Sequence, residues 1–293
     1  MLIVDSQIHL WQQGHPHAQH RQAPYLPAEA LSAMDVAGVT RAINHPPPWD
    51  PGAVTLAAQA AQDHSDRLAW LGWFPVERPE SRALVAAWAR RPGLLGLRFS
   101  FNAPEQRSWP TDGTLDWLWP SAEQAGLPIG LAAARFLPVV GRIAERHPAL
   151  KLHVDHMGVL QGKVGSSAFD HLPDLLALAR LPNVAVKLSA VPAYATDAFP
   201  FRSLHDPLRR IVDAFGPRRC FWGTDITRMP CSWSRCVELF TEQLPWLQGE
   251  DLAMGHGPCG VRMARLAFAG SGGRPMMLEA GVVAVLPSVG CLT

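Results

Sequence analysis

The sequence predicts an α/β fold: one closed (β/α)8 barrel, or TIM barrel, with long loops over the face where the strands end. Short apolar runs recur at a near-constant spacing, and each is followed by a loop and then by a segment with helical periodicity. Such runs are typical of strands that are buried on both faces of a parallel sheet. Because helix-connected parallel strands cross over with one hand, eight such units close into a barrel.

The elements follow one another in a regular order along the chain. The predicted strands are the apolar runs at residues 2–5, 41–45, 68–74, 94–99, 128–131, 150–155, 184–188 and 220–223. Helices are expected where apolar residues repeat with helical period, at residues 28–37, 54–63, 80–89, 115–125, 137–146, 171–178, 204–215 and 234–247. Glycine follows several of these helices, as at Gly38, Gly126 and Gly216, because it takes the left-handed conformation at low cost and turns the chain.

Loops and tail complete the expected single domain of residues 1–293. The longest irregular stretches each follow a strand, at residues 12–26, 102–114 and 189–202, so we expect them to cover the catalytic face. The tail from about residue 255 fits the barrel poorly, because Gly and Pro residues interrupt what should be a closing helix. Deleting residues 270–293 is therefore expected to cost the barrel little stability.

Composition restricts the classes of function. The chain of 293 residues is 48% hydrophobic and 17% charged with a net charge of +1, which suits a large core and excludes disorder. Without a basic or acidic block, no nucleic acid is expected as a partner. The start lacks a positive n-region and no apolar run is long enough to span a membrane, so we expect a cytoplasmic protein. Its five cysteines are expected to be free thiols, and a homo-oligomer remains open.

The residues that carry chemistry stand at the two ends of the predicted barrel. Residues 5–9 hold Asp5, Gln7 and His9, and the last predicted strand runs directly into Asp225. A closed barrel places its first and last strands side by side, so Asp225 is expected near His9. A carboxylate in that position can take a proton from water and direct the resulting hydroxide at a carbonyl carbon.

Five short motifs together resemble a known family. They are Asp5-x-Gln7-x-His9-x-Trp11, Gly96-Leu97-Arg98, Leu152-x-x-Asp155-His156-Met157-Gly158, Asn183-Val184-x-Val186-Lys187 and Trp222-Gly223-Thr224-Asp225. In this order they look like the amidohydrolase superfamily, and within it the "amidohydrolase 2" branch of lactone hydrolases and non-oxidative decarboxylases. The resemblance covers roughly residues 1–250. It implies a (β/α)8 barrel and the hydrolysis or decarboxylation of a small carbonyl compound.

The expected metal content follows from departures from the family pattern. The resemblance implies two histidines at the end of the first strand, and here Gln7 replaces one of them beside His9. No donor follows the fifth strand, which continues as Ala132-Ala133-Ala134. A binuclear centre is therefore not expected. The alternatives left open are no metal at all, or one zinc-like divalent cation on His9, His156 and Asp225, with Gln7 a weak neutral ligand.

Other polar residues at strand ends are candidate substrate ligands. We expect Arg98, Lys187 and Arg228 to hold a carboxylate or a developing oxyanion, which favours an anionic or polar small-molecule substrate. Further candidates are Gln7, His45 and Trp49. His156 and His9 are expected to polarise the carbonyl, whereas His153 is expected to be structural and on the opposite face of its strand from Asp155. For each residue the alternative is a purely structural contact.

Three functions are compatible with this set. The favoured one is a lactonase-like hydrolase in which Asp225 activates water, because a lactone is reactive enough to dispense with a metal. The alternative is a metal-dependent non-oxidative decarboxylase of the same fold, which Gln7 disfavours. The third is a catalytically silent member that binds a ligand, which Gln7 and the triple alanine favour but His9, His156 and Asp225 oppose.

Overall fold

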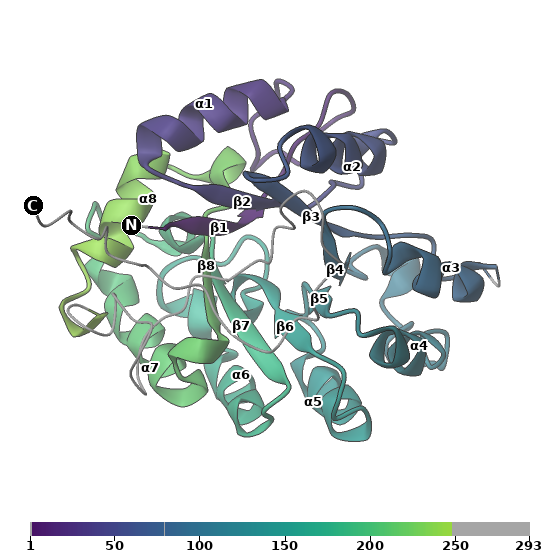
Figure 1. The fold of residues 1–293 in the computed structure, drawn as a ribbon. Coiled ribbons are helices and arrows are strands. Elements are labelled where there is room, and N and C mark those ends of the chain that lie inside the picture. The colour runs from purple at the N-terminus through teal and green to yellow at the C-terminus, as the bar shows by residue number, and fades with distance from the viewer. Residues whose placement is uncertain (1, 79, 248–293) are drawn as a thin grey trace, which may run out of the picture.

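The computed structural model describes residues 2–78 and 80–247. Its centre is one sheet of eight strands, hydrogen-bonded in sequence order and all parallel (Figure 1). The strands are β1 Val4–Ile8, β2 Arg41–Asn44, β3 Leu68–Gly72, β4 Leu94–Phe99, β5 Ile129–Leu131, β6 Leu152–Val154, β7 Val184–Ser189 and β8 Cys220–Gly223. The predicted barrel of parallel strands is therefore confirmed.

The sheet closes on itself where β1 and β8 lie side by side. The backbone N–H of Asp225 donates to the carbonyl oxygen of Gln7 over 2.7 Å. The Asp5 carboxylate accepts the backbone N–H of Thr224 and the indole N–H of Trp233, each over 2.9 Å. These contacts fix the end of the last strand against the first strand, so that residues more than 200 positions apart share one site.

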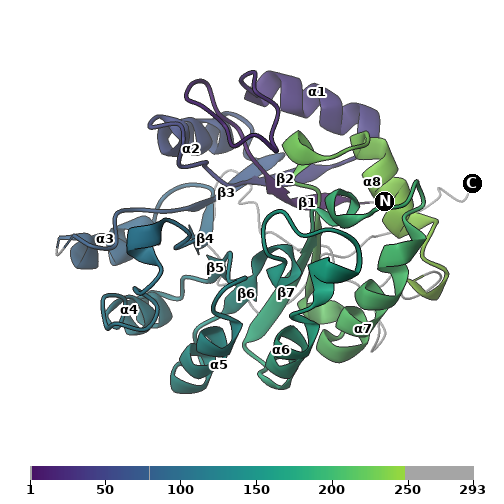
Figure 2. The same ribbon diagram turned by 180° about the vertical axis from the view of Figure 1, so that it is seen from behind.

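In the described part of the chain, eight α-helices surround the strands. They are α1 Pro27–Ala37, α2 Ala53–Asp63, α3 Ser81–Trp88, α4 Leu118–Ala125, α5 Leu137–Arg146, α6 Leu172–Ala177, α7 His205–Phe215 and α8 Trp233–Thr241. In both ribbon views α8 lies beside α1, which closes the outer ring (Figures 1 and 2). Gly38 and Gly126 end α1 and α4 with φ of 71° and 65°, as the glycine pattern predicts.

The element boundaries differ from prediction at both ends of the barrel. The first strand is Val4–Ile8 rather than 2–5, because Ile8 continues the buried run past an irregularity in register between Asp5 and Ile8. The last helix ends at Thr241 instead of 247, and a 3-10 turn at Pro245–Leu247 follows it, since proline cannot continue a helix. The predicted poorly matched tail lies outside the described residues.

The barrel core is apolar and tightly packed at the β1–β8 seam. A side chain at Gly223 would place its Cβ 2.8 Å from Ser6 Oγ and 3.0 Å from Gln7 Cβ, so only glycine allows this close approach.

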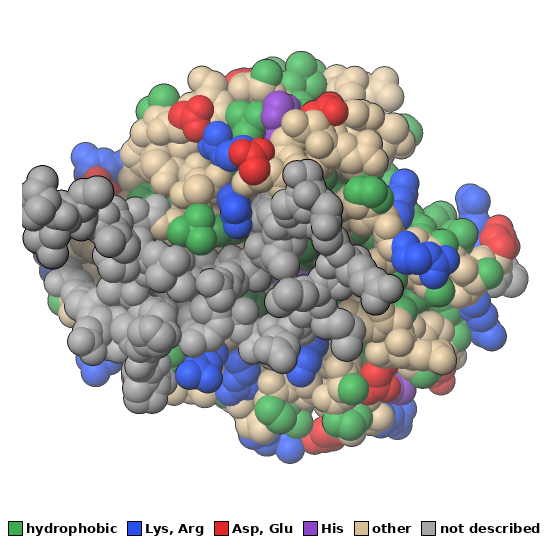
Figure 3. Space-filling view, in the orientation of Figure 1, with side chains coloured by type: hydrophobic (Ala, Val, Ile, Leu, Met, Phe, Trp, Pro, Cys, Tyr) green, Lys and Arg blue, Asp and Glu red, His purple; other side chains and the backbone are tan. Residues whose placement is uncertain are grey.

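Within the described residues, no helix is long and apolar enough to cross a membrane. On the face in Figure 3, basic and acidic side chains lie singly or in small groups between neutral ones.

Candidate active site

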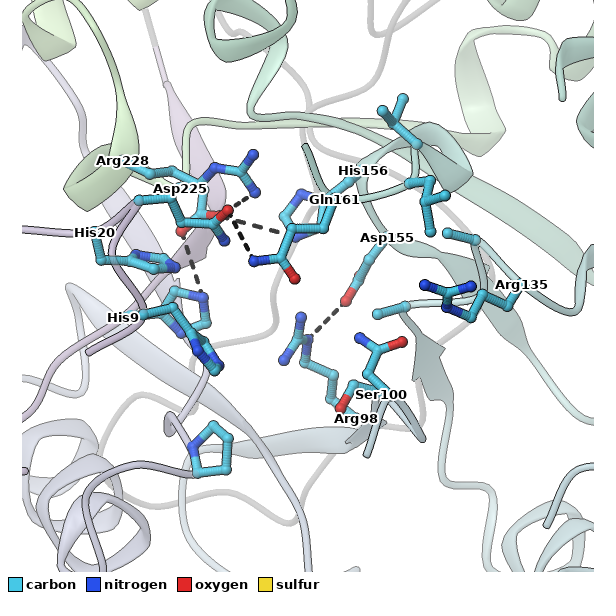
Figure 4. A pocket seen from close by; sticks show the side chains of 18 of the residues that line it. His9, His20, Arg98, Ser100, Arg135, Asp155, His156, Gln161, Asp225 and Arg228 are labelled. Carbon is cyan, nitrogen blue, oxygen red and sulfur yellow. Dashed lines mark hydrogen bonds and ion pairs between the residues drawn. The ribbon is translucent and has the colours of Figure 1, made fainter. Parts of the chain in front are cut away.

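A cavity of about 230 Å³ opens at the C-terminal ends of the strands (Figure 4). Six of the residues proposed from the sequence line it: His9, Trp49, Arg98, His156, Asp225 and Arg228. They come from segments that follow β1, β2, β6 and β8 and from β4 itself, which the barrel brings to one rim. The cavity is thus where a barrel of this kind carries its chemistry.

Asp225 stands at the centre of the polar groups. Its Oδ1 lies 3.4 Å from His9 Nε2, and its Oδ2 lies 3.8 Å from His156 Nε2 and 3.6 Å from Arg228 Nη1. Oδ1 is buried and has no hydrogen-bond partner in the described part of the chain. The backbone of Asp225 is left-handed, with φ of 56°, an uncommon conformation that clusters at functional sites. The structure therefore presents a free carboxylate oxygen to the cavity.

The charges of this group follow from burial and neighbours. Burial alone would raise the pKa of Asp225, but His9, His156 and Arg228 together hold it below its ordinary value. Burial lowers the pKa of His9, and it lowers the pKa of His156 to about 3. At neutral pH the site thus holds one carboxylate between two neutral imidazoles, with the Arg228 guanidinium beside it.

Hydrogen bonds fix the His9 tautomer. Its Nδ1 lies 2.6 Å from the carbonyl oxygen of His45, which can only accept, so the ring proton of a neutral His9 is on Nδ1. The Nε2 lone pair then accepts from the Gln7 amide nitrogen, 3.3 Å away. The His9 lone pair is therefore already used, and Asp225 Oδ1, 3.4 Å from His9 Nε2, is the acceptor that has no hydrogen-bond donor among the described residues.

His156 has the opposite arrangement. Ser189 Oγ accepts the backbone N–H of His156 over 3.2 Å and lies 2.9 Å from its Nδ1. When the serine hydroxyl donates to Nδ1, the proton of the neutral ring is on Nε2, on the side of Asp225 and the cavity. His156 can therefore donate a hydrogen bond to a bound carbonyl oxygen, whereas the Nε2 of neutral His9 carries no proton to donate.

Three other proposed substrate ligands, Gln7, His45 and Lys187, are buried and do not line the cavity. Lys187 Nζ donates to Gln7 Oε1 over 2.6 Å and lies 3.0 Å from His45 Nε2 and 3.1 Å from Asp155 Oδ1. The bond to Lys187 turns the Gln7 amide so that its oxygen faces the ammonium and its nitrogen faces His9. These residues thus form a layer that orients the site from beneath.

His153 corrects one expectation about the sixth strand. Its Nε2 lies 3.6 Å from Asp155 Oδ1, so the two side chains share a face of the strand instead of pointing apart. The reason is the two-residue period of a strand, which places residues two positions apart on the same side. A Cβ at Gly130 would lie 2.2 Å from the His153 ring, so the neighbouring strand leaves room for it.

The donor set does not fit a metal in this arrangement. The Gln7 oxygen is bonded to Lys187, and the Gln7 amide N–H occupies the His9 lone pair that a cation would need. His9 Nε2 also lies nearest to Oδ1 of Asp225, whereas His156 Nε2 lies nearest to Oδ2. Among the described residues, no group of three His, Cys, Asp or Glu side chains is arranged to hold a metal ion.

Sequence reasoning missed several groups on the cavity wall. Asp155, which has no role predicted from the sequence, lines the cavity, and its Oδ2 accepts from Arg98 Nε over 2.6 Å, so this buried carboxylate is shared between Arg98 and the layer below. Arg107 and Arg135 also line the cavity, and neither has an acidic partner within the described ranges. Arg135 directly follows Ala132-Ala133-Ala134 after β5, and its guanidinium is the charged group that this loop brings to the cavity. The cavity consequently carries more positive than negative side-chain charge.

The sequence matches one family model over most of its length. The model, described as amidohydrolase (Amidohydro_2), covers residues 4–252. The chain belongs to the amidohydrolase family. This finding confirms the resemblance that the five motifs predict, and the amidohydrolase fold accounts for the position of the cavity at the strand ends.

Two L-fucono-1,5-lactonases are similar to this amidohydrolase in sequence. The protein from Burkholderia ambifaria is 29% identical over 159 residues, which are 53% of this chain and 53% of that protein. The protein from Burkholderia multivorans is 30% identical over 183 residues, which are 57% of this chain and 60% of that protein. The matches thus span little more than half of either relative.

Solved structures show the same fold. An amidohydrolase from Burkholderia multivorans with bound zinc has a TM-score of 0.69 at 23% identity, covering 82% of this chain and 90% of that one. A probable 2-pyrone-4,6-dicarboxylic acid hydrolase from Acinetobacter baumannii with bound citric acid has a TM-score of 0.65 at 17% identity, covering 84% and 93%. Each likeness covers more than four fifths of this chain.

Proposed function

We propose that this amidohydrolase hydrolyses a lactone, with Asp225 as the general base. The observation that carries the proposal is the buried Oδ1 of Asp225, which has no hydrogen-bond partner among the described residues and lies 3.4 Å from His9 Nε2. An unpaired carboxylate oxygen in this position can accept the proton of a water molecule. The similarity to two L-fucono-1,5-lactonases supports the same reaction class.

The reaction balances with the residues of the chain alone. Water donates one proton toward Asp225 and its oxygen attacks the lactone carbonyl carbon, while His156 Nε2–H donates to the carbonyl oxygen as it becomes negative. When the ring C–O bond breaks, the leaving alkoxide takes the proton that Asp225 received. The product is a hydroxy acid, which releases one proton at neutral pH. No metal enters these steps.

The positive charge on the cavity wall favours an anionic or strongly polar lactone. Arg107 and Arg135 lack acidic partners in the described chain, so a substrate carboxylate would find two guanidiniums without having to displace an existing ion pair. Arg98 and Arg228 are already paired with Asp155 and Asp225. We therefore assign substrate binding mainly to Arg107 and Arg135, and orientation of the carboxylates to Arg98 and Arg228.

Acid release from a panel of lactones tests the proposal. The purified chain is incubated with neutral sugar lactones and with lactones that carry a carboxylate, and proton release is followed in a pH-stat while mass spectrometry identifies the product. The expected product is heavier than the substrate by one water molecule, and carboxylated lactones are expected to have the lower KM. Release of carbon dioxide from a carboxylic acid, dependent on an added divalent cation, would instead establish the decarboxylase alternative.

A further inference from the structure

A second hollow adjoins the catalytic cavity at the barrel mouth. It has a volume of about 200 Å³ and shares Pro48, Arg98 and Ser100 with the catalytic cavity, so the two hollows are direct neighbours. Most of its remaining lining is aromatic or apolar: Pro46, Trp73, Phe74, Pro75, Val76, Phe99, Phe101 and Trp109. The hydrolytic steps described above use none of these aromatic side chains.

The aromatic wall is held in a fixed arrangement. Phe99 stacks on Phe101 with ring centroids 5.5 Å apart and planes 13° apart, and its edge meets Phe74 at 5.9 Å. Phe101 in turn lies 6.2 Å from the ring of Trp109. Because these rings support one another, the hollow keeps its shape without a ligand, and little ordering is needed when an apolar group enters.

Phe101 adds a second, independent observation. Its φ is 44°, in the left-handed region that bulky residues avoid. Such backbone conformations persist only where the surrounding structure requires them, and they cluster at ligand sites. At Phe101 this conformation accompanies a ring that is stacked on Phe99 and faces the hollow. The folded chain therefore holds the Phe101 ring in the aromatic wall although the backbone conformation of this residue is unfavourable.

We infer that this aromatic hollow binds an apolar, ring-sized substituent of the substrate whose lactone ring lies in the catalytic cavity. The inference rests on the proposed lactone hydrolysis. A cavity of about 150 Å³ lined by apolar side chains accommodates benzene, so a hollow of about 200 Å³ accommodates a phenyl group or a short alkyl chain. Sugar hydroxyls placed against the phenylalanine rings would lose water without gaining partners, and the polar side chains of the unshared lining are Glu77 and Gln106. The substrate class is thus a lactone with an aryl or alkyl substituent.

The test compares lactones that share one ring and differ only in the substituent. Initial rates are measured for δ-valerolactone and for its δ-phenyl and δ-pentyl derivatives. Since even one well-buried methylene changes kcat/KM by roughly 10–200-fold, the substituted lactones should exceed the parent by at least about tenfold. In Trp109→Ala and Phe101→Ala the ratio of kcat/KM for the substituted lactone to kcat/KM for δ-valerolactone should fall below about threefold. In Trp117→Ala, a control at a half-buried tryptophan that lines neither hollow, the ratio should persist.

A binding measurement separates failure of this inference from failure of the proposed reaction. Calorimetry compares the ring-opened acids, with and without the phenyl group, and the phenyl acid should bind at least about tenfold more tightly to the parent protein but not to Trp109→Ala. Lactone turnover without any preference for the substituent would overturn the inference and leave the hydrolase intact. If the phenyl acid binds more tightly but no lactone is turned over, the binding role of the hollow is supported and the proposed hydrolysis is refuted. Equal binding of both acids would overturn the inference.

Discussion

Replacing the buried lysine under the active site should destabilise the fold strongly. In Lys187→Met, Asp155 Oδ1 loses an ammonium 3.1 Å away, and Gln7 Oε1 loses its donor at 2.6 Å. Removing one partner of a buried ion pair typically costs 3–5 kcal/mol, because the other charge stays buried and unpaired. Arg98 still holds Asp155 Oδ2 at 2.6 Å. We therefore expect a loss near the lower end of this range, about 3 kcal/mol.

Urea unfolding followed by circular dichroism measures this loss. The matched control is Lys163→Met, which removes an exposed lysine 3.7 Å from the exposed Asp170. Exposed pairs contribute little, so this control should change the free energy of unfolding by less than about 1 kcal/mol. If Lys187→Met unfolds at the same urea concentration as the parent, Lys187 does not neutralise Asp155, which would contradict the role of Lys187 in the layer beneath the site.

Two further predictions concern acid stability and substrate binding. Burial lowers the pKa of five histidines, which the unfolded chain therefore protonates first as the pH falls: His9, His20, His45, His153 and His156. Asp5, whose pKa burial raises to about 6, binds a proton in the folded chain and offsets one of these five. The free energy of unfolding should therefore fall with a slope that approaches about 5 kcal/mol per pH unit between pH 6.5 and 5, and a flat profile in urea titrations over this range would refute this. Arg135→Gln should raise KM for a carboxylated lactone about tenfold and leave kcat and the KM of a neutral lactone within threefold, and equal effects on both lactones would contradict its assignment as an anion ligand.

The barrel could be predicted because its signal is local and repeated. Each strand is buried on both faces, so its apolar run is visible in the sequence, and closure then places Asp225 beside His9 without further information. The end of the first strand was missed because an irregularity in register near Asp5 breaks the simple pattern. Strand ends are where polar functional residues replace the apolar run, so they are the least visible boundaries.

The site could be predicted only in part because side-chain partners are long-range. His9, Arg98 and Asp225 line the cavity as expected, since strand-end position alone determines which rim they join. Gln7 and Lys187 stand near strand ends too, but their mutual bond across 180 positions keeps both beneath the cavity. Loop residues such as Arg135 do not follow a helical or strand period, so the sequence does not predict that they line the cavity.

The central claim is that Asp225 is the proton acceptor in lactone hydrolysis. Its direct test is the turnover of Asp225→Asn, which keeps the shape of the side chain and removes its basicity, measured by pH-stat on the best lactone of the panel. General-base assistance is typically worth 10²–10⁴-fold, so kcat should fall by about that factor while circular dichroism shows the parent fold. The control is His153→Gln, which lies outside the cavity lining and should stay within a few-fold of the parent. Equal turnover by Asp225→Asn and the parent protein would contradict the mechanism.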